Sequence, residues 1–161
     1  MPISTLSANM VVQWALTHTN TGGFAPTTQG PDGVEYNLAD LNTIFDQLYS
    51  ASLTVNPSST TTLDLTSLTN LVDESLSFTA LLFLFALPSG AALSVGPGAS
   101  NGLQIFGGTG VAVGVPVNGA LFWGGDPAGA GLTVNSTNKT LAFRNAGAGT
   151  LTLDLVLAGD A

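Results

Sequence analysis

The sequence predicts a mainly β protein: a β-sandwich of jelly-roll type with an N-terminal arm and one short helix. Hydrophobic residues make up 45% of the 161-residue chain, but they are spread among 20 glycines, 8 prolines and many Thr, Ser and Asn residues. Such a mixture is typical of many short strands joined by turns. Several segments also alternate apolar and polar residues, as strands with one buried face do.

Residues 1–36 are expected to form the N-terminal arm. Met10–Thr17 is rich in strand-forming residues. Residues 19–34 show no periodic pattern and contain the turn sequence Pro31-Asp32-Gly33, so they are expected to be a loop. An arm of this kind suits a segment that lies on a neighbouring molecule and becomes ordered there by adding a strand to an exposed sheet edge.

One helix is expected over residues 37–49. Asn37 is suited to cap its start, and the carboxylate of Asp40 would lie near the positive N-terminal end. Apolar residues repeat at helical spacing and would pack on the sheet; they are Leu38, Leu41, Ile44, Phe45 and Leu48.

The remaining chain completes a domain over residues 37–161 that is expected to be the sandwich. Glycine-rich turns separate its segments, and a short helical turn is expected at residues 67–73. In the last segment the leucines at 151, 153, 155 and 157 would share one face. The expected strands are Thr60–Leu65, Ser77–Leu87, Ala92–Val95, Leu103–Phe106, Val111–Val117, Gly119–Trp123, Leu132–Val134, Leu141–Arg144 and Thr150–Ala158.

The most apolar run, Ala80–Leu87, is too short to cross a bilayer, which takes about 20 apolar residues. It is expected to be a strand buried on both faces. The first ten residues have no basic region before an apolar one, so no signal peptide is expected. No membrane partner is predicted.

Charge is scarce. Only 7% of residues are charged, whereas soluble proteins carry about a quarter. The two cations are Lys139 and Arg144, and the formal net charge is −8. Nucleic-acid binding draws its affinity from Lys and Arg at phosphates, so no nucleic-acid partner is expected. A surface with so few charges is expected to be covered by other subunits, which favours a structural or assembly protein.

Residues suited to catalysis are few and scattered. The chain has no cysteine and a single histidine, His18, so thiolate chemistry and a histidine-based triad are not expected. Asp73 and Glu74 are adjacent, which would point them to opposite sides of a strand rather than form an acid–base pair. No enzymatic activity is expected.

No cofactor or metal is expected either. Asp32, Glu35 and Asp40 lie close in sequence, but their spacing does not match a regular calcium-binding loop. The glycine-rich stretch Gly107–Gly110 lacks the lysine of a phosphate-binding loop, and no helix is expected after it. It is interpreted as a turn between strands.

The four large polar aromatic residues allow two interpretations. Trp14, Tyr36, Tyr49 and Trp123 could form a platform for stacking sugars, as in a carbohydrate-binding module. Aromatic residues in β-sandwiches more often anchor cores or interfaces. Trp14 and Trp123 are therefore the candidate subunit-interface residues, Trp123 because it precedes the loop sequence Gly124-Gly125.

Parts of the second half resemble small virion structural proteins of tailed bacteriophages. The segments that carry the resemblance are Thr61–Leu68 (TTLDLTSL), Pro116–Phe122 (PVNGALF) and above all Leu132–Gly159, with Asn145-Ala146-Gly147-Ala148-Gly149 followed by Asp154-Leu155-Val156-Leu157-Ala158-Gly159. The resemblance spans residues 38–159. The chain departs from that pattern in having fewer charges and in Leu153, where an aromatic residue is common.

The resemblance implies a non-enzymatic β-sandwich on a capsid or tail. The leading expectation is a capsid decoration (cement) protein, a homotrimer bound to the major capsid protein at the virion surface and made in the host cytoplasm. It would bridge capsomers against the pressure of packaged DNA. A tail or fibre component is the second expectation, and a carbohydrate-binding module is the third.

Overall fold

The computed structural model describes five stretches of the chain: residues 9–10, 36–37, 46–69, 74–125 and 130–161. The chain divides into two compact units, Met1–Thr43 and Ile44–Ala161. In the first unit the described residues form an antiparallel pair of short strands, β1 (Asn9–Met10) and β2 (Tyr36–Asn37). The expected boundary after residue 36 falls inside this unit.

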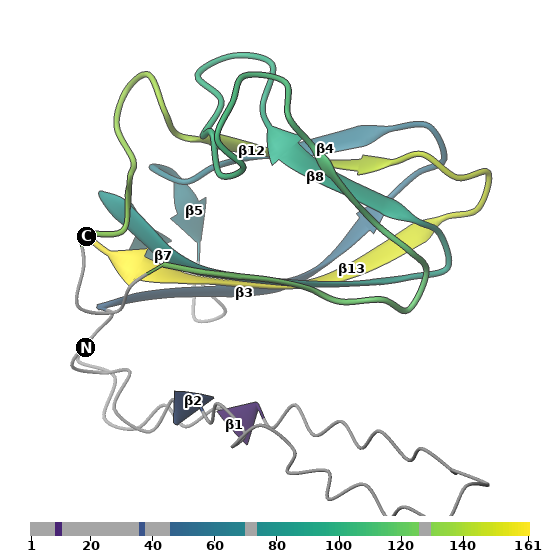
Figure 1. The fold of residues 1–161 in the computed structure, drawn as a ribbon, viewed down its shortest axis with the longest axis horizontal. Coiled ribbons are helices and arrows are strands. Elements are labelled where there is room, and N and C mark those ends of the chain that lie inside the picture. Colours follow the sequence, from purple (N-terminus) through teal and green to yellow (C-terminus); the bar gives the residue numbers. More distant parts are fainter. Residues whose placement is uncertain (1–8, 11–35, 38–45, 70–73, 126–129) are drawn as a thin grey trace, which may run out of the picture. The chain divides into compact units, whose positions relative to one another are not determined.

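The second unit is all β in its described residues, and its two main sheets face each other (Figure 1). One sheet has the order β10-β7-β13-β3, with β11 also paired to β7, and the other has the order β4-β12-β8-β9. A separate small pair joins β5 to β6. The strands are β3 (Gln47–Val55), β4 (Thr60–Asp64), β5 (Leu68–Thr69), β6 (Ser75–Leu76), β7 (Ala80–Ser89), β8 (Leu93–Pro97), β9 (Val113–Val115), β10 (Leu121–Gly124), β11 (Leu132–Thr133), β12 (Thr140–Asn145) and β13 (Leu151–Asp160).

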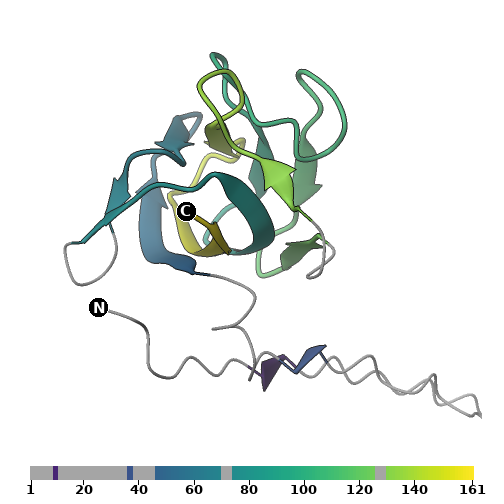
Figure 2. The same ribbon diagram turned by 90° about the vertical axis from the view of Figure 1, so that its left-hand side faces the viewer.

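The strands of the two sheets pair as one folded ribbon. Strand β3 pairs with β13, β4 with β12, β7 with β10 and β8 with β9, all antiparallel. Short connections join β3 to β4, β7 to β8, β9 to β10 and β12 to β13, so each strand of one sheet lies across from its chain neighbour in the other. This is the jelly-roll arrangement, and it confirms the predicted fold class. Figure 2 shows it from the side.

Alternation along the strands places the core between the sheets. The leucines at 151, 153, 155 and 157 of β13 are at most 1% exposed, while Thr152 and Asp154 between them face solvent. Burying a leucine side chain contributes about 1.5–3 kcal/mol, so this strand is a main source of stability. Strand β7 is confirmed as a strand, although Phe83, Phe85 and Leu87 on its outer face are half-buried rather than buried.

The expected helix over residues 37–49 is wrong at both ends. Asn37 belongs to strand β2 and residues 47–49 begin strand β3; residues 38–45 lie outside the described residues. From Tyr49 the chain alternates inward Tyr49, Ala51, Leu53 and Val55 with outward polar residues. That period of two fits the pleat of the sheet. Hydrogen bonding to β13 then favours a strand over a helix.

Two shorter expectations also fail. Leu103–Phe106 is not a strand: Leu103 and Ile105 are buried, but the segment runs through turns. Its apolar residues contribute to the core from a loop. The expected helical turn at residues 67–73 is replaced by strand β5 at Leu68–Thr69, and residues 70–73 lie outside the described residues.

A buried asparagine fastens the turn between β12 and β13. Asn145 is fully buried, and its side-chain amide donates to the carbonyls of Val55 (3.0 Å) and Gly149 (2.7 Å). Its Oδ1 accepts from the backbone N–H of Gly147 at 2.9 Å. Because a buried polar group without partners is costly, these bonds make asparagine the suited residue at this position.

We expect Asn145→Ala to lower the free energy of unfolding by about 2 kcal/mol or more, because it leaves two carbonyls and one N–H without partners. Asn145→Asp keeps the acceptor for Gly147 but sets a carboxylate against two carbonyls, so its loss at neutral pH should be at least as large. Urea denaturation measures both. The matched control, Asn56→Ala at an exposed position, should change stability by less than about 0.5 kcal/mol; equal effects at both positions would contradict the assignment.

Candidate functional site

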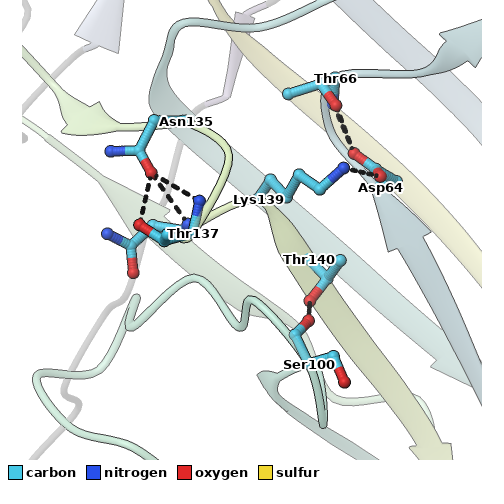
Figure 3. A network of polar contacts seen from close by, with 8 residues as sticks. Asp64, Thr66, Ser100, Asn135, Thr137, Lys139 and Thr140 are labelled. Carbon is cyan, nitrogen blue, oxygen red and sulfur yellow. Dashed lines mark hydrogen bonds and ion pairs between the residues drawn. The ribbon is translucent and has the colours of Figure 1, made fainter.

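The most developed polar cluster joins the end of β4 to the start of β12 (Figure 3). Lys139 Nζ lies 2.6 Å from Asp64 Oδ2, and both side chains are partly exposed. Asp64 Oδ1 accepts from the hydroxyl of Thr66 at 2.7 Å and from its backbone N–H at 3.0 Å. Asp64 also stands opposite Thr140 in the β4–β12 ladder. The carboxylate therefore closes the turn after β4 and ties it to β12.

The surroundings of Asp64 set its protonation. Partial burial would by itself raise the pKa of Asp64, but the hydrogen bonds from Lys139 and Thr66, together with the charge of Lys139, hold this pKa below the ordinary value. The carboxylate is therefore ionised at neutral pH and remains so into the acid range.

Neighbouring loops are fastened to the same end of β12. Asn135 Oδ1 accepts from the N–H and hydroxyl of Thr137 and from the N–H of Asn138. The hydroxyl of Thr140 donates to the carbonyl of Ser100 at 2.6 Å. These bonds join loop residues to the ends of β4 and β12, so we call the cluster a structural clasp.

The titratable residues considered for chemistry do not gather in the described part of the chain. No group of three His, Cys, Asp or Glu residues that could hold a metal occurs there, and Glu74 is exposed. Outside the described residues lie His18, Asp32, Glu35, Asp40 and Asp73. Gly107–Gly110 forms turns that lead towards strand β9. Among the described residues, no helix is long and apolar enough to cross a membrane.

The aromatic residues proposed as a sugar platform are not brought together among the described side chains. Tyr49 is 7% exposed and faces the core, where burial raises its pKa. Trp123 of β10 is half-buried and packs against the same core. Trp14 lies outside the described residues, as does the side chain of Tyr36. The role of Trp14 and Trp123 as interface residues stays a prediction.

The sequence analysis considered Trp and Tyr and therefore overlooked Phe122, an aromatic residue that faces outward. Leu121 and Trp123 of β10 pack against the core, whereas Phe122 between them is 36% exposed. Its ring meets that of Phe83 edge to face, with 5.0 Å between the centroids. The alternation Leu-Phe-Trp-Gly was the signal that could have separated the outward Phe122 from the inward Trp123.

These features define a jelly roll that is all β in the part of the chain the structure describes, with a polar cluster that joins loops to strand ends. No protein-family model, curated protein or solved structure matches the chain. The function is therefore argued from the fold, the surfaces and the residues themselves.

We expect Asp64→Asn to remove an acid-sensitive contribution to stability. The folded-state pKa of Asp64 is lowered, so its contribution is present above the unfolded-state value of about 4 and is lost as the pH falls through the folded-state value. Because both side chains are partly exposed, the loss at neutral pH should be no more than about 1 kcal/mol.

Free energies of unfolding measured from pH 7 down to strongly acid solution test this. The difference between the wild type and Asp64→Asn should shrink as the pH falls. Asp154→Asn, which removes the same charge from an exposed position of β13, serves as the control. If the free energies of unfolding of the wild type and Asp64→Asn ran parallel over this pH range, ionised Asp64 would contribute no net stabilisation.

Proposed function

We propose that this chain is a virion structural protein of a tailed bacteriophage, and specifically a decoration protein that binds the outside of the capsid as a homotrimer. The observation that carries the proposal is the place of the phage-like C-terminal motif in the fold. Its residues include β11, β12 and β13, and of these β12 and β13 occupy inner positions of the two sheets. Eight-stranded jelly rolls recur in viral capsid proteins.

The motif residues have a physical task in the turn between β12 and β13. Asn145 bonds to Gly147 and Gly149, and the leucines that follow fill the core. The resemblance is thus one of fold-specifying residues rather than catalytic ones, and it supports a protein that is selected for its shape. A protein of this kind acts by covering and joining its neighbours.

The surface supports the same role. With 7% charged residues, the sandwich can make contacts without removing many charges from water, which is the costly step in forming an interface. A decoration protein repeats one contact at many symmetric sites, so weak individual contacts sum to a firm attachment. In this role the protein would hold adjacent capsomers together.

We expect the purified chain to co-sediment with DNA-filled heads of the phage that encodes it. Mixtures with heads lacking tails, with isolated tails and with protein-free buffer distinguish the possibilities. Binding to heads alone supports decoration, and binding to tails alone would replace it by the tail or fibre alternative. Binding to neither, with tryptophan fluorescence quenched by a glycan, would favour the carbohydrate-binding alternative instead.

The arm has a separate test. If residues 1–35 lie on a neighbouring molecule, their deletion should lower occupancy on heads by about tenfold or more. The deletion variant should keep the circular dichroism of the sandwich, which checks that the body is intact. Unchanged occupancy would show that attachment does not need the arm.

A further inference from the structure

Cleavage points for one large class of proteases are scarce in this chain. Trypsin-like proteases cut the peptide bond that follows a lysine or an arginine, because their specificity pocket binds a cationic side chain. The chain has two such residues, Lys139 and Arg144. Residues 1–138 and 145–161 contain no lysine or arginine, so these proteases can attack two bonds in the whole sequence.

Both bonds belong to strand β12 or lead directly into it. The bond after Lys139 precedes the first residue of β12, and the bond after Arg144 joins its last two residues. Strand β12 is an inner strand, hydrogen-bonded to β4 on one side and to β8 on the other. Proteolysis of a folded protein proceeds through states in which the cleaved segment has opened, so these two ladders have to separate first.

The bond after Lys139 is held on both sides. The N–H of Lys139 donates to the carbonyl of Asn101 at 2.7 Å, and its carbonyl accepts from the N–H of Leu65 at 2.8 Å. Across the bond, the N–H of Thr140 also donates to Asn101, at 2.9 Å. The ammonium group that a protease would have to bind lies 2.6 Å from Asp64 Oδ2. Backbone and side chain are therefore both engaged within the folded chain.

Arg144 shows that an exposed side chain does not make an exposed bond. The residue is exposed, but its backbone stands opposite Thr60 in β4 and Ser94 in β8. The next residue, Asn145, is 0% exposed, and its N–H donates to the carbonyl of Ser59 at 2.9 Å. A protease can reach this bond only after Asn145 has left the interior.

Release of β12 would also open the core. Leu141 and Phe143 of this strand face inward and are 0% exposed. Local opening is easy where few buried apolar contacts are broken, as at termini and loops. Release of β12 instead removes two core side chains and breaks two ladders together, so exposure of either bond belongs to the unfolding of the sandwich.

We propose that the folded chain resists trypsin-like proteases because of where its two basic residues stand, and that these proteases cut it only when the sandwich unfolds. Residues 1–35 cannot be trimmed by this class, since they contain no basic residue. A chain with this property persists among such proteases while it is folded and is removed once it unfolds. The inference does not need the capsid, and its test is independent of head binding.

Trypsin digestion of the full chain over a range of urea concentrations tests the proposal. Cleavage rates relative to those of the unfolded chain give the free energy of the opening that permits cleavage. That free energy should fall with urea at the same slope as global unfolding followed by circular dichroism, because the slope reports the surface exposed. A clearly shallower slope would mean that β12 opens locally and would overturn the proposal.

Two variants with one new lysine each test the importance of position. Thr109 and Thr152 are both exposed, but Thr109 lies in the loop between β8 and β9, whereas Thr152 lies on the inner strand β13. In native buffer Thr109→Lys should be cut at least about a hundredfold faster than the wild type, because exposed loops are the preferred sites of nicking. Thr152→Lys should stay within about threefold of the wild type.

Equal cleavage rates for the two variants, whether both fast or both slow, would overturn the proposal, because protection would then not depend on where a basic residue stands. Mass spectrometry of the fragments identifies the bond that is cut in each variant. Circular dichroism and urea unfolding check that both variants fold with stability near that of the wild type. If Thr152→Lys does not fold, Asp154→Lys, at an exposed position of the same strand, takes its place.

Discussion

The fold depends on one strand whose inward face is buried from end to end. Strand β13 is hydrogen-bonded to β3 on one side and to β7 on the other, and its four leucines project into the space between the sheets. Because the neighbours of β13 take their registers from it, the inward alternation of both strands follows from these leucines. The second sheet is then placed by the turn that Asn145 closes.

The polar interactions of this molecule fix its loops, whereas the leucines stabilise its core. The bond between Lys139 and Asp64 and the bonds of Asn135 and Thr140 lie where loops meet strand ends. Partly exposed ion pairs contribute little to stability, so their effect is to choose one loop arrangement among several. Apolar burial supplies most of the stabilising free energy of this molecule. A small number of polar bonds fixes the conformation of its loops.

The sequence predicted the sandwich well because alternation and turn residues act locally. The sequence alone predicted a strand at Leu151 to Leu157 and the glycine-rich turns, without any tertiary information. A helix was expected where β3 begins because Ile44, Phe45 and Leu48 repeat at helical spacing, while the alternation from Tyr49 to Val55 starts directly after them. Pairing with a strand about a hundred residues later decides between the two patterns, and local propensity cannot report such a partner.

The surfaces were harder to predict than the core. Leu103 and Ile105 alternate as in a strand, yet they reach the core from a loop, so burial alone did not reveal their conformation. On β10 the emphasis fell on Trp123 because it precedes Gly124-Gly125, whereas register turns its neighbour Phe122 outward. Which residue faces solvent depends on the strand's phase relative to its partner, and that phase is known only once the sheet is assembled.

The nested pairing of the strands has a consequence for how the chain finds its fold. Strands β8 and β9 are close in sequence, and once they meet, β7 and β10 are brought near each other, then β4 and β12, and finally β3 and β13. Each closure shortens the free loop that the next pair must close, so the entropic cost is met in small steps. We therefore expect a zipper-like order from the innermost hairpin outwards, and slow folding overall, because the outermost ladder joins segments so distant along the chain.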